Sequence, residues 1–81
     1  MVLLRNITLI NEHLVTMDCH VVDQIENQDF SLEFDPVTRK IFSNLDGIDR
    51  YYAGHAVLHV FYMYLNSNGK KLPKESIANW V

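Results

Sequence analysis

The chain has 81 residues, of which 48% are hydrophobic and 21% charged, and its net charge is −3. This composition is typical of one small globular domain spanning residues 1–81, and it excludes a disordered chain. Nine of the ten acidic residues lie in 12–49, beside only two basic ones, so no coherent basic surface for nucleic acid is expected. A lone cysteine, Cys19, excludes an internal disulfide framework and favours a reducing, cytoplasmic location.

The sequence also gives no reason to expect contact with a membrane. Arg5 follows only three apolar residues, so the first residues do not have the pattern of a signal peptide. The longest apolar stretch, within residues 46–69, is about thirteen residues long and contains two histidines, which is too short and too polar for a bilayer span. We therefore expect a soluble protein.

The first third of the chain predicts two strands. Residues 2–10 carry apolar side chains on both parities, the pattern of a strand that is covered on both faces. Residues 15–21 alternate instead, with Val15, Met17, Cys19 and Val21 on one face. Such alternation predicts a half-buried strand.

A hairpin is predicted over residues 30–43. Phe30, Leu32 and Phe34 alternate with polar residues, and Asp35-Pro36 is a favourable start for a turn. The residues after that turn, 41–42, are expected to form a short fourth strand.

Residues 46–69 predict one long helix. Asp46 and Asp49 suit its N-terminus, and Gly69 suits the position just past its end. At about 100° per residue, one side of this helix is expected to face the core. That side carries Gly54, Val57, Leu58, Phe61 and Leu65. The glycine would let the helix approach the sheet closely.

The resulting fold class is α+β, a four-stranded antiparallel sheet in β-β-β-β-α order with the long helix packed on one face. Pro73 is expected to open a short C-terminal helical turn over residues 74–81. A single helix covers only one side of the sheet, so the other side is expected to need a cover as well.

The second side of the predicted helix is the candidate functional surface. It carries aromatic and polar side chains together: Tyr52, His55, His59, Tyr62 and Met63. Tyrosine combines a large apolar area with a polar tip and is enriched at protein interfaces. These residues therefore predict a surface that binds a partner, unless another strand or the C-terminal tail covers it within the chain.

The two histidines of that side invite a second interpretation. His55 and His59 are four residues apart, so both could bind one metal ion. The sequence marks no third ligand, although His20, Asp18 or Cys19 could supply one if the second strand lay nearby. Ordinary hydrogen bonds at a groove or interface are therefore the expected role of both histidines. No catalytic residue and no cofactor are predicted.

The functional prediction is a small non-enzymatic interaction module. It would be a homodimer, or an adaptor- or inhibitor-type subunit that docks on another protein through Tyr52, His55, His59, Tyr62 and Met63. The alternative is a small-ligand or metal-binding protein, conceivably an enzyme, that uses His55 and His59 with Tyr52 and Tyr62.

Overall fold

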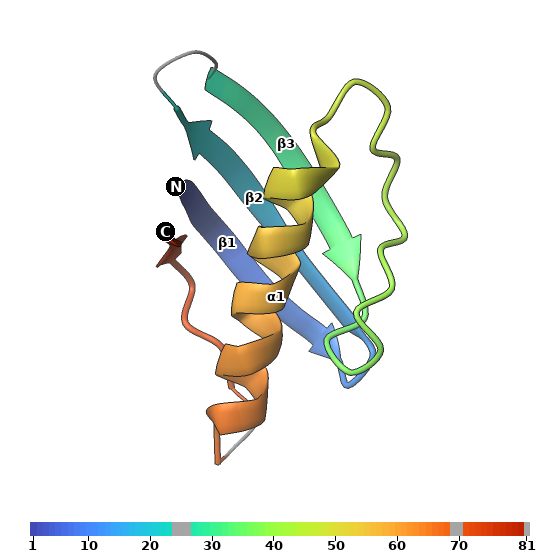
Figure 1. Ribbon diagram of the computed structural model, residues 1–81. Coiled ribbons are helices and arrows are strands. Elements are labelled where there is room, and N and C mark those ends of the chain that lie inside the picture. Colours follow the sequence, from blue (N-terminus) through green and yellow to red (C-terminus); the bar gives the residue numbers. More distant parts are fainter. Residues whose placement is uncertain (24–26, 69–70, 81) are drawn as a thin grey trace.

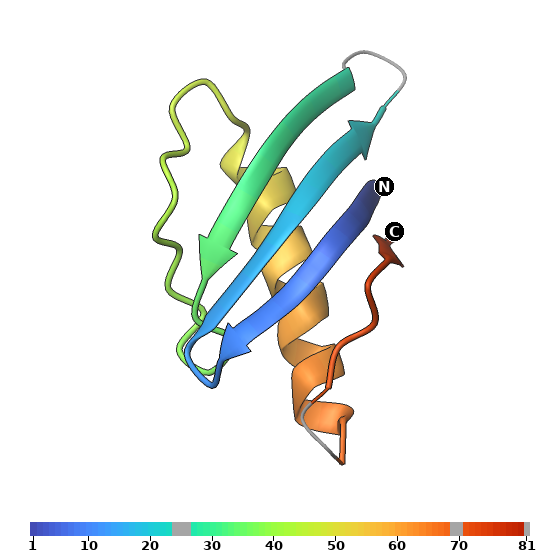
Figure 2. The same cartoon turned by 180° about the vertical axis from the view of Figure 1, so that it is seen from behind.

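The computed structural model describes residues 1–23, 27–68 and 71–80. Its elements are β1 (Val2–Asn11), β2 (Leu14–Val22), β3 (Asn27–Phe34), α1 (Arg50–Asn66) and β4 (Ser76–Ala78). The strands form one antiparallel sheet in the order β3-β2-β1-β4, and α1 lies across one face of it (Figure 1). Seen from behind, the other face of the sheet has no helix of the described residues over it (Figure 2). The predicted α+β class, with four antiparallel strands and one helix, is confirmed.

The fourth strand is not the predicted one. Ser76–Ala78 pairs with the first residues of β1, so the element order is β-β-β-α-β. The predicted strand at 41–42 makes only an isolated bridge between Phe34 and Ile41. The C-terminal segment is extended rather than helical because hydrogen bonds to β1 outweigh the weak local preference of a Pro73 start. The predicted helical turn is therefore wrong, and its last residue, Val81, lies outside the described residues.

Strand β1 contains a bulge that the sequence pattern conceals. Asn6 has a positive φ of 52°, and the register shifts between the Arg5 and Thr8 pairs with β2. An extra residue in one strand reverses which parity faces the core. Leu4 and Ile7 are consequently both buried under α1, although their parities differ. The mixed pattern of residues 2–10 thus comes from this bulge and not from cover on two faces.

The core lies between the sheet and α1. The alternating residues predicted for β2 and β3 are buried there, including Cys19, whose thiol pKa is raised by burial to about 12. The helix contributes a narrow strip of mostly small side chains: Ala53, Ala56, Val57, Val60 and Tyr64. Alanines at this contact let the helix lie close to the strands.

The predicted rotation of the helix is wrong. Of the five residues expected in the core only Val57 is buried, whereas Gly54 is exposed and Leu65 is 59% exposed. A Cβ atom built on Gly54 would have nothing within 4 Å, so this glycine does not permit a close approach to the sheet. The helix is apolar nearly all round, and such a sequence does not specify a unique buried face.

Of the signals predicted for the helix ends, the structure confirms the one at Asp49, and the helix is shorter than predicted. Asp49 caps the N-terminus, where its carboxylate accepts from the backbone N–H of Tyr51 at 2.9 Å. Asp46 instead lies in a turn that contains Gly47, with φ 74°. The helix stops at Asn66, and the predicted Gly69 lies outside the described residues.

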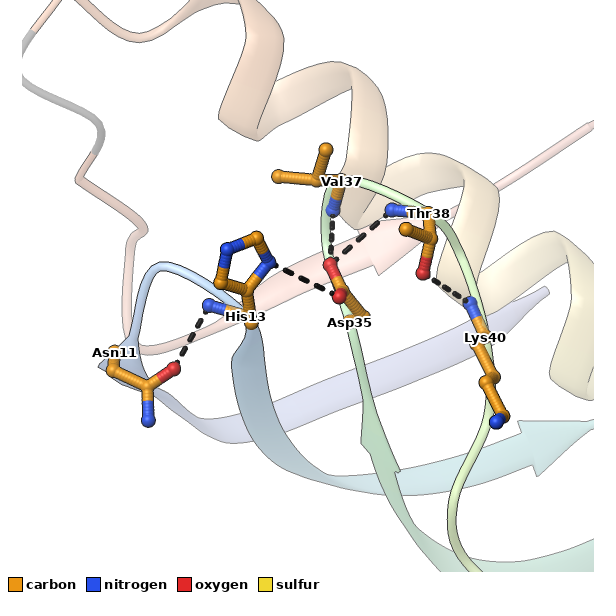
Figure 3. A network of polar contacts seen from close by, with 6 residues as sticks. All are labelled: Asn11, His13, Asp35, Val37, Thr38 and Lys40. Carbon is orange, nitrogen blue, oxygen red and sulfur yellow. Dashed lines mark hydrogen bonds and ion pairs between the residues drawn. The ribbon is translucent and has the colours of Figure 1, made fainter.

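The turn after β3 is held by one buried carboxylate. Asp35 is 7% exposed and accepts from the backbone N–H groups of Val37 (2.7 Å) and Thr38 (3.2 Å). Its second oxygen lies 3.2 Å from Nδ1 of His13, in the β1–β2 turn (Figure 3). Burial pushes the pKa of Asp35 upward, but these backbone and His13 contacts hold it below its ordinary value. Asp35 therefore ties together two turns at the same end of the sheet.

We expect Val60→Ala to lower the free energy of unfolding by about 2 kcal/mol, because it leaves a cavity under the helix. Leu65→Ala should change it by about 0.5 kcal/mol or less, because that side chain is exposed. Urea denaturation at low micromolar concentration measures both. A larger loss for Leu65→Ala than for Val60→Ala would contradict the helix rotation described above.

Asp35 should also make stability depend on acidity. A carboxylate whose folded pKa is depressed stabilises the fold above its unfolded pKa, here an ordinary 3.8, and loses that contribution as pH falls through the lower folded value. We therefore expect the wild type to lose more stability than Asp35→Asn as pH falls below about 4. Thermal melts of both proteins between neutral pH and pH 2 measure this, and parallel curves would contradict it.

Candidate interaction surface of the helix

The outward side of α1 is the most unusual surface of the described chain. After Arg50, the helix contains no charged residue up to its last residue, Asn66. Tyr51, Tyr62 and Leu65 are exposed by 56%, 54% and 59%. Large apolar side chains that are contiguous on a surface mark interaction sites more often than isolated ones do. We call Tyr51, Leu58, Tyr62 and Leu65 the outer stripe; Leu58 is its half-buried member.

Only one of the five predicted partner-binding residues lies on the outer stripe. This residue is Tyr62. Tyr52 and Met63 lie on the flank and pack against the core, and the Tyr52 hydroxyl donates to the Asp23 carboxylate. His55 and His59 are half-buried. The predicted docking surface and the outer stripe therefore share Tyr62 alone.

The C-terminal tail covers one flank of the helix, as the sequence alternative allowed. The Trp80 indole stacks on the His55 ring, with centroids 4.1 Å apart and planes 4° from parallel. Its Nε1–H donates to the Tyr51 hydroxyl at 2.8 Å. This contact fixes Tyr51 at one end of the outer stripe. The sequence predicts that Trp80 packs against the body of the fold but assigns neither Tyr51 nor Trp80 to the functional surface; the signal available was that Trp80 is the only tryptophan of the chain.

His59 connects the helix to β4. Its Nε2 lies 2.9 Å from the Ser76 hydroxyl, and burial lowers the pKa of its imidazole below the ordinary value. The ring is thus held neutral, in contact with the short strand that completes the sheet. Together with the stacked pair of His55 and Trp80, it attaches the C-terminal tail to the helix.

Within the described residues, the metal alternative finds no third ligand close to these histidines. Among the described residues, no three His, Cys, Asp or Glu side chains are grouped so that they could hold a metal ion. Of the side chains considered for that role, Asp18 and His20 point away from α1, and Cys19 is buried in the core. His20 instead lies 2.5 Å from Asp29, a carboxylate of β3.

The uncovered face of the sheet is mostly polar. Asp18 accepts from Asn6 and Ser31, both at 2.8 Å, and these two hydrogen bonds lower its carboxyl pKa. Around them is a shallow hollow of about 440 Å³, bordered also by Arg5 and His20. An antiparallel sheet can present a polar face to water, so this face does not need the cover that the sequence interpretation expected.

No helix within the described part of the chain has the length and apolar character needed to cross a membrane.

His59 makes attachment of the tail dependent on pH. A histidine whose folded pKa is depressed leaves stability intact above its unfolded pKa, an ordinary 6.5, and stability falls as pH drops through that value. We expect the wild type to lose more stability than His59→Gln between pH 7.5 and 5. Paired urea titrations measure the difference, and hydrogen exchange at Ser76–Ala78 should quicken in the wild type. An equal loss in both proteins would contradict this role of His59.

Comparison of the sequence with protein-family models and curated proteins, and of the structure with solved structures, found no match.

Proposed function

We propose that this protein is a non-enzymatic interaction module that docks on a protein surface through the outer stripe of α1. One observation carries the proposal. Tyr51, Tyr62 and Leu65 each expose more than half of their surface on a helix without a charge beyond its first residue. Removing such side chains from water on binding contributes roughly 25 cal/mol per Å² of apolar surface.

The chemical character of the stripe supports a protein partner. Tyrosines offer large, rigid contact area together with a hydroxyl that can hydrogen-bond at the rim of an interface. The Tyr51 hydroxyl already accepts from Trp80, so this ring is held in place before binding. A side chain that is ordered in advance loses less conformational entropy when a partner binds.

The metal- or ligand-binding alternative is favoured by no observation. His59 bonds to Ser76, and the imidazole of His55 is stacked on Trp80. Both rings therefore serve the packing of the tail. The proposal accordingly moves the docking surface from the histidine flank to the outer stripe and keeps Tyr62 as its centre.

Photo-crosslinking tests the proposed surface. A benzophenone amino acid at position 62 should give protein adducts, with the purified chain or in an extract of the native host. The same probe at Ile10, which is 55% exposed and lies at the end of β1, is the matched control and should give few.

The second part of the test asks whether the stripe itself is responsible. Adding Leu65→Asp to the position-62 probe should reduce the adduct yield several-fold, because a carboxylate would be buried in an apolar contact. Equal yields at positions 62 and 10, or a yield insensitive to Leu65→Asp, would overturn the proposed function.

A further inference from the structure

We infer that the partner of the outer stripe is a second copy of this chain, whose α1 packs antiparallel to the first with Leu58 beside the two-fold axis. This inference rests on the proposed function and names the occupant of its docking surface. Three features of α1 support a second copy as the partner: the spacing of the stripe, the position of Gly54 and the charges at the two helix ends.

The stripe has the spacing of a helix-pairing seam. Tyr51, Leu58 and Leu65 are seven residues apart, the repeat that keeps side chains on the line of contact between two helices. In an antiparallel pair centred on Leu58, this residue meets its own copy. Tyr51 of each chain then lies opposite Leu65 of the other. All three contacts are between apolar or aromatic side chains.

Gly54 and Tyr62 are complementary in shape. The positions i, i+3, i+4 and i+7 on a helix frame a hole for a side chain of a facing helix, and here they are Tyr51, Gly54, His55 and Leu58. The hole is open on the glycine side, because a Cβ at Gly54 would meet nothing within 4 Å. Tyr62 lies four residues beyond Leu58, as far from the axis as Gly54 lies before it. The two-fold axis therefore places Tyr62 of each chain at the open hole of the other.

The outward side of α1 is free to receive another helix. In Figure 1 the segment before α1 and the C-terminal tail run along its two flanks, and no described element lies in front of it. A hollow of about 410 Å³ continues from Gly54 and Leu58 to Thr38, Arg39 and Ile41 on one flank. This hollow gives the facing chain room beside the seam.

Charge favours one relative direction of the two helices. Asp46 and Asp49 precede α1, whose first residue is Arg50, so this end carries a net charge of −1, and the exposed Lys71 follows the helix. A parallel pair would bring like charges and like helix-dipole ends together, whereas an antiparallel pair brings the acidic start of one helix to the basic end of the other. Between these ends the seam contains no charged side chain, so the pairing buries no charge.

The size of the contact indicates a dissociable dimer. A standard interface buries about 800 Å² per partner, which is about one seventh of the 5389 Å² that this chain exposes. A helix of 17 residues is only about 25 Å long, so a pair of helices alone provides less than that. We therefore expect sedimentation to show twice the 9.5 kDa of one chain at high concentration and dissociation on dilution.

Disulfide trapping tests the register. Leu58→Cys should cross-link to its own copy under a mild oxidant, whereas Leu65→Cys alone should not. Tyr51→Cys combined with Leu65→Cys should cross-link again, and only between chains, because the two positions are about 21 Å apart on one helix. The wild type is the blank, since its one cysteine, Cys19, is buried. Leu65→Cys cross-linking as fast as Leu58→Cys would indicate parallel helices and overturn the inference.

Two substitutions at Gly54 test the hole without endangering the fold. Leucine and alanine both have higher helix propensity than glycine. Gly54→Leu should close the hole and weaken self-association at least tenfold by sedimentation, while Gly54→Ala should weaken it much less. Self-association unchanged by Gly54→Leu would overturn the inference.

The outcomes separate this inference from the proposed function. A wild type that stays monomeric at every concentration overturns the second copy as occupant. If the probe at position 62 still captures another protein in a Leu65-dependent manner, the interaction module stands and only its partner changes. If the probe captures nothing, both proposals fall.

Discussion

The closeness of α1 to the sheet is the constraint on which the other features depend. Ala53 and Ala56 are fully buried at this contact, with Val60 beside them. Because mostly small side chains occupy the buried side, with Tyr64 the exception, several of the larger ones lie elsewhere on the helix. Leu58, Tyr62 and Leu65 are consequently turned outward, where a helix of a monomeric protein ordinarily carries charges. The apolar outer surface is thus a direct result of how the inner one packs.

The close contact between α1 and the sheet also determines which segments pack against the two flanks of the helix. On one flank, the tail brings Trp80 onto His55 and Ser76 to His59. On the other flank, the Arg39 guanidinium lies 5.0 Å from the centroid of the Phe61 ring. Each flank is therefore bordered by a segment distant in sequence, and the side chains of those segments limit which part of α1 can reach a partner.

The strands of the first half were predictable because one of their faces is buried and the other is not. Apolar and polar residues alternate at 15–21 and 30–34, as a strand with one buried face and one exposed face requires. The bulge at Asn6 was not predictable, since the residue is not a glycine and the strand continues on both sides of it. Three residues, Ser76–Ala78, are too few to show a period, and their partner is 74 residues or so away along the chain.

The candidate surface was only partly predictable. Its place on the long helix followed from the apolar run and the Asp49 cap. Its rotation did not, because alanines and a glycine carry little hydrophobic signal while leucines and phenylalanine carry much. The most hydrophobic residues of a helix are ordinarily expected in the core, but in α1 several of them lie outside the core. Tyr62 was identified because it is a tyrosine on the helix side that also carries His55 and His59.

The pairing of β4 with the start of β1 has a consequence for how the protein folds. Val2 lies opposite Ala78, so β4, which follows β1, β2, β3 and α1 along these residues, completes the edge that β1 provides. Before β4 has docked, that edge of β1 presents unpaired backbone groups, which is the condition under which strands pair with wrong neighbours. Closing so long a loop is also slow compared with forming the β1–β2 hairpin. Until β4 is in place, the free edge of β1 is therefore the part of the sheet to which another strand could add.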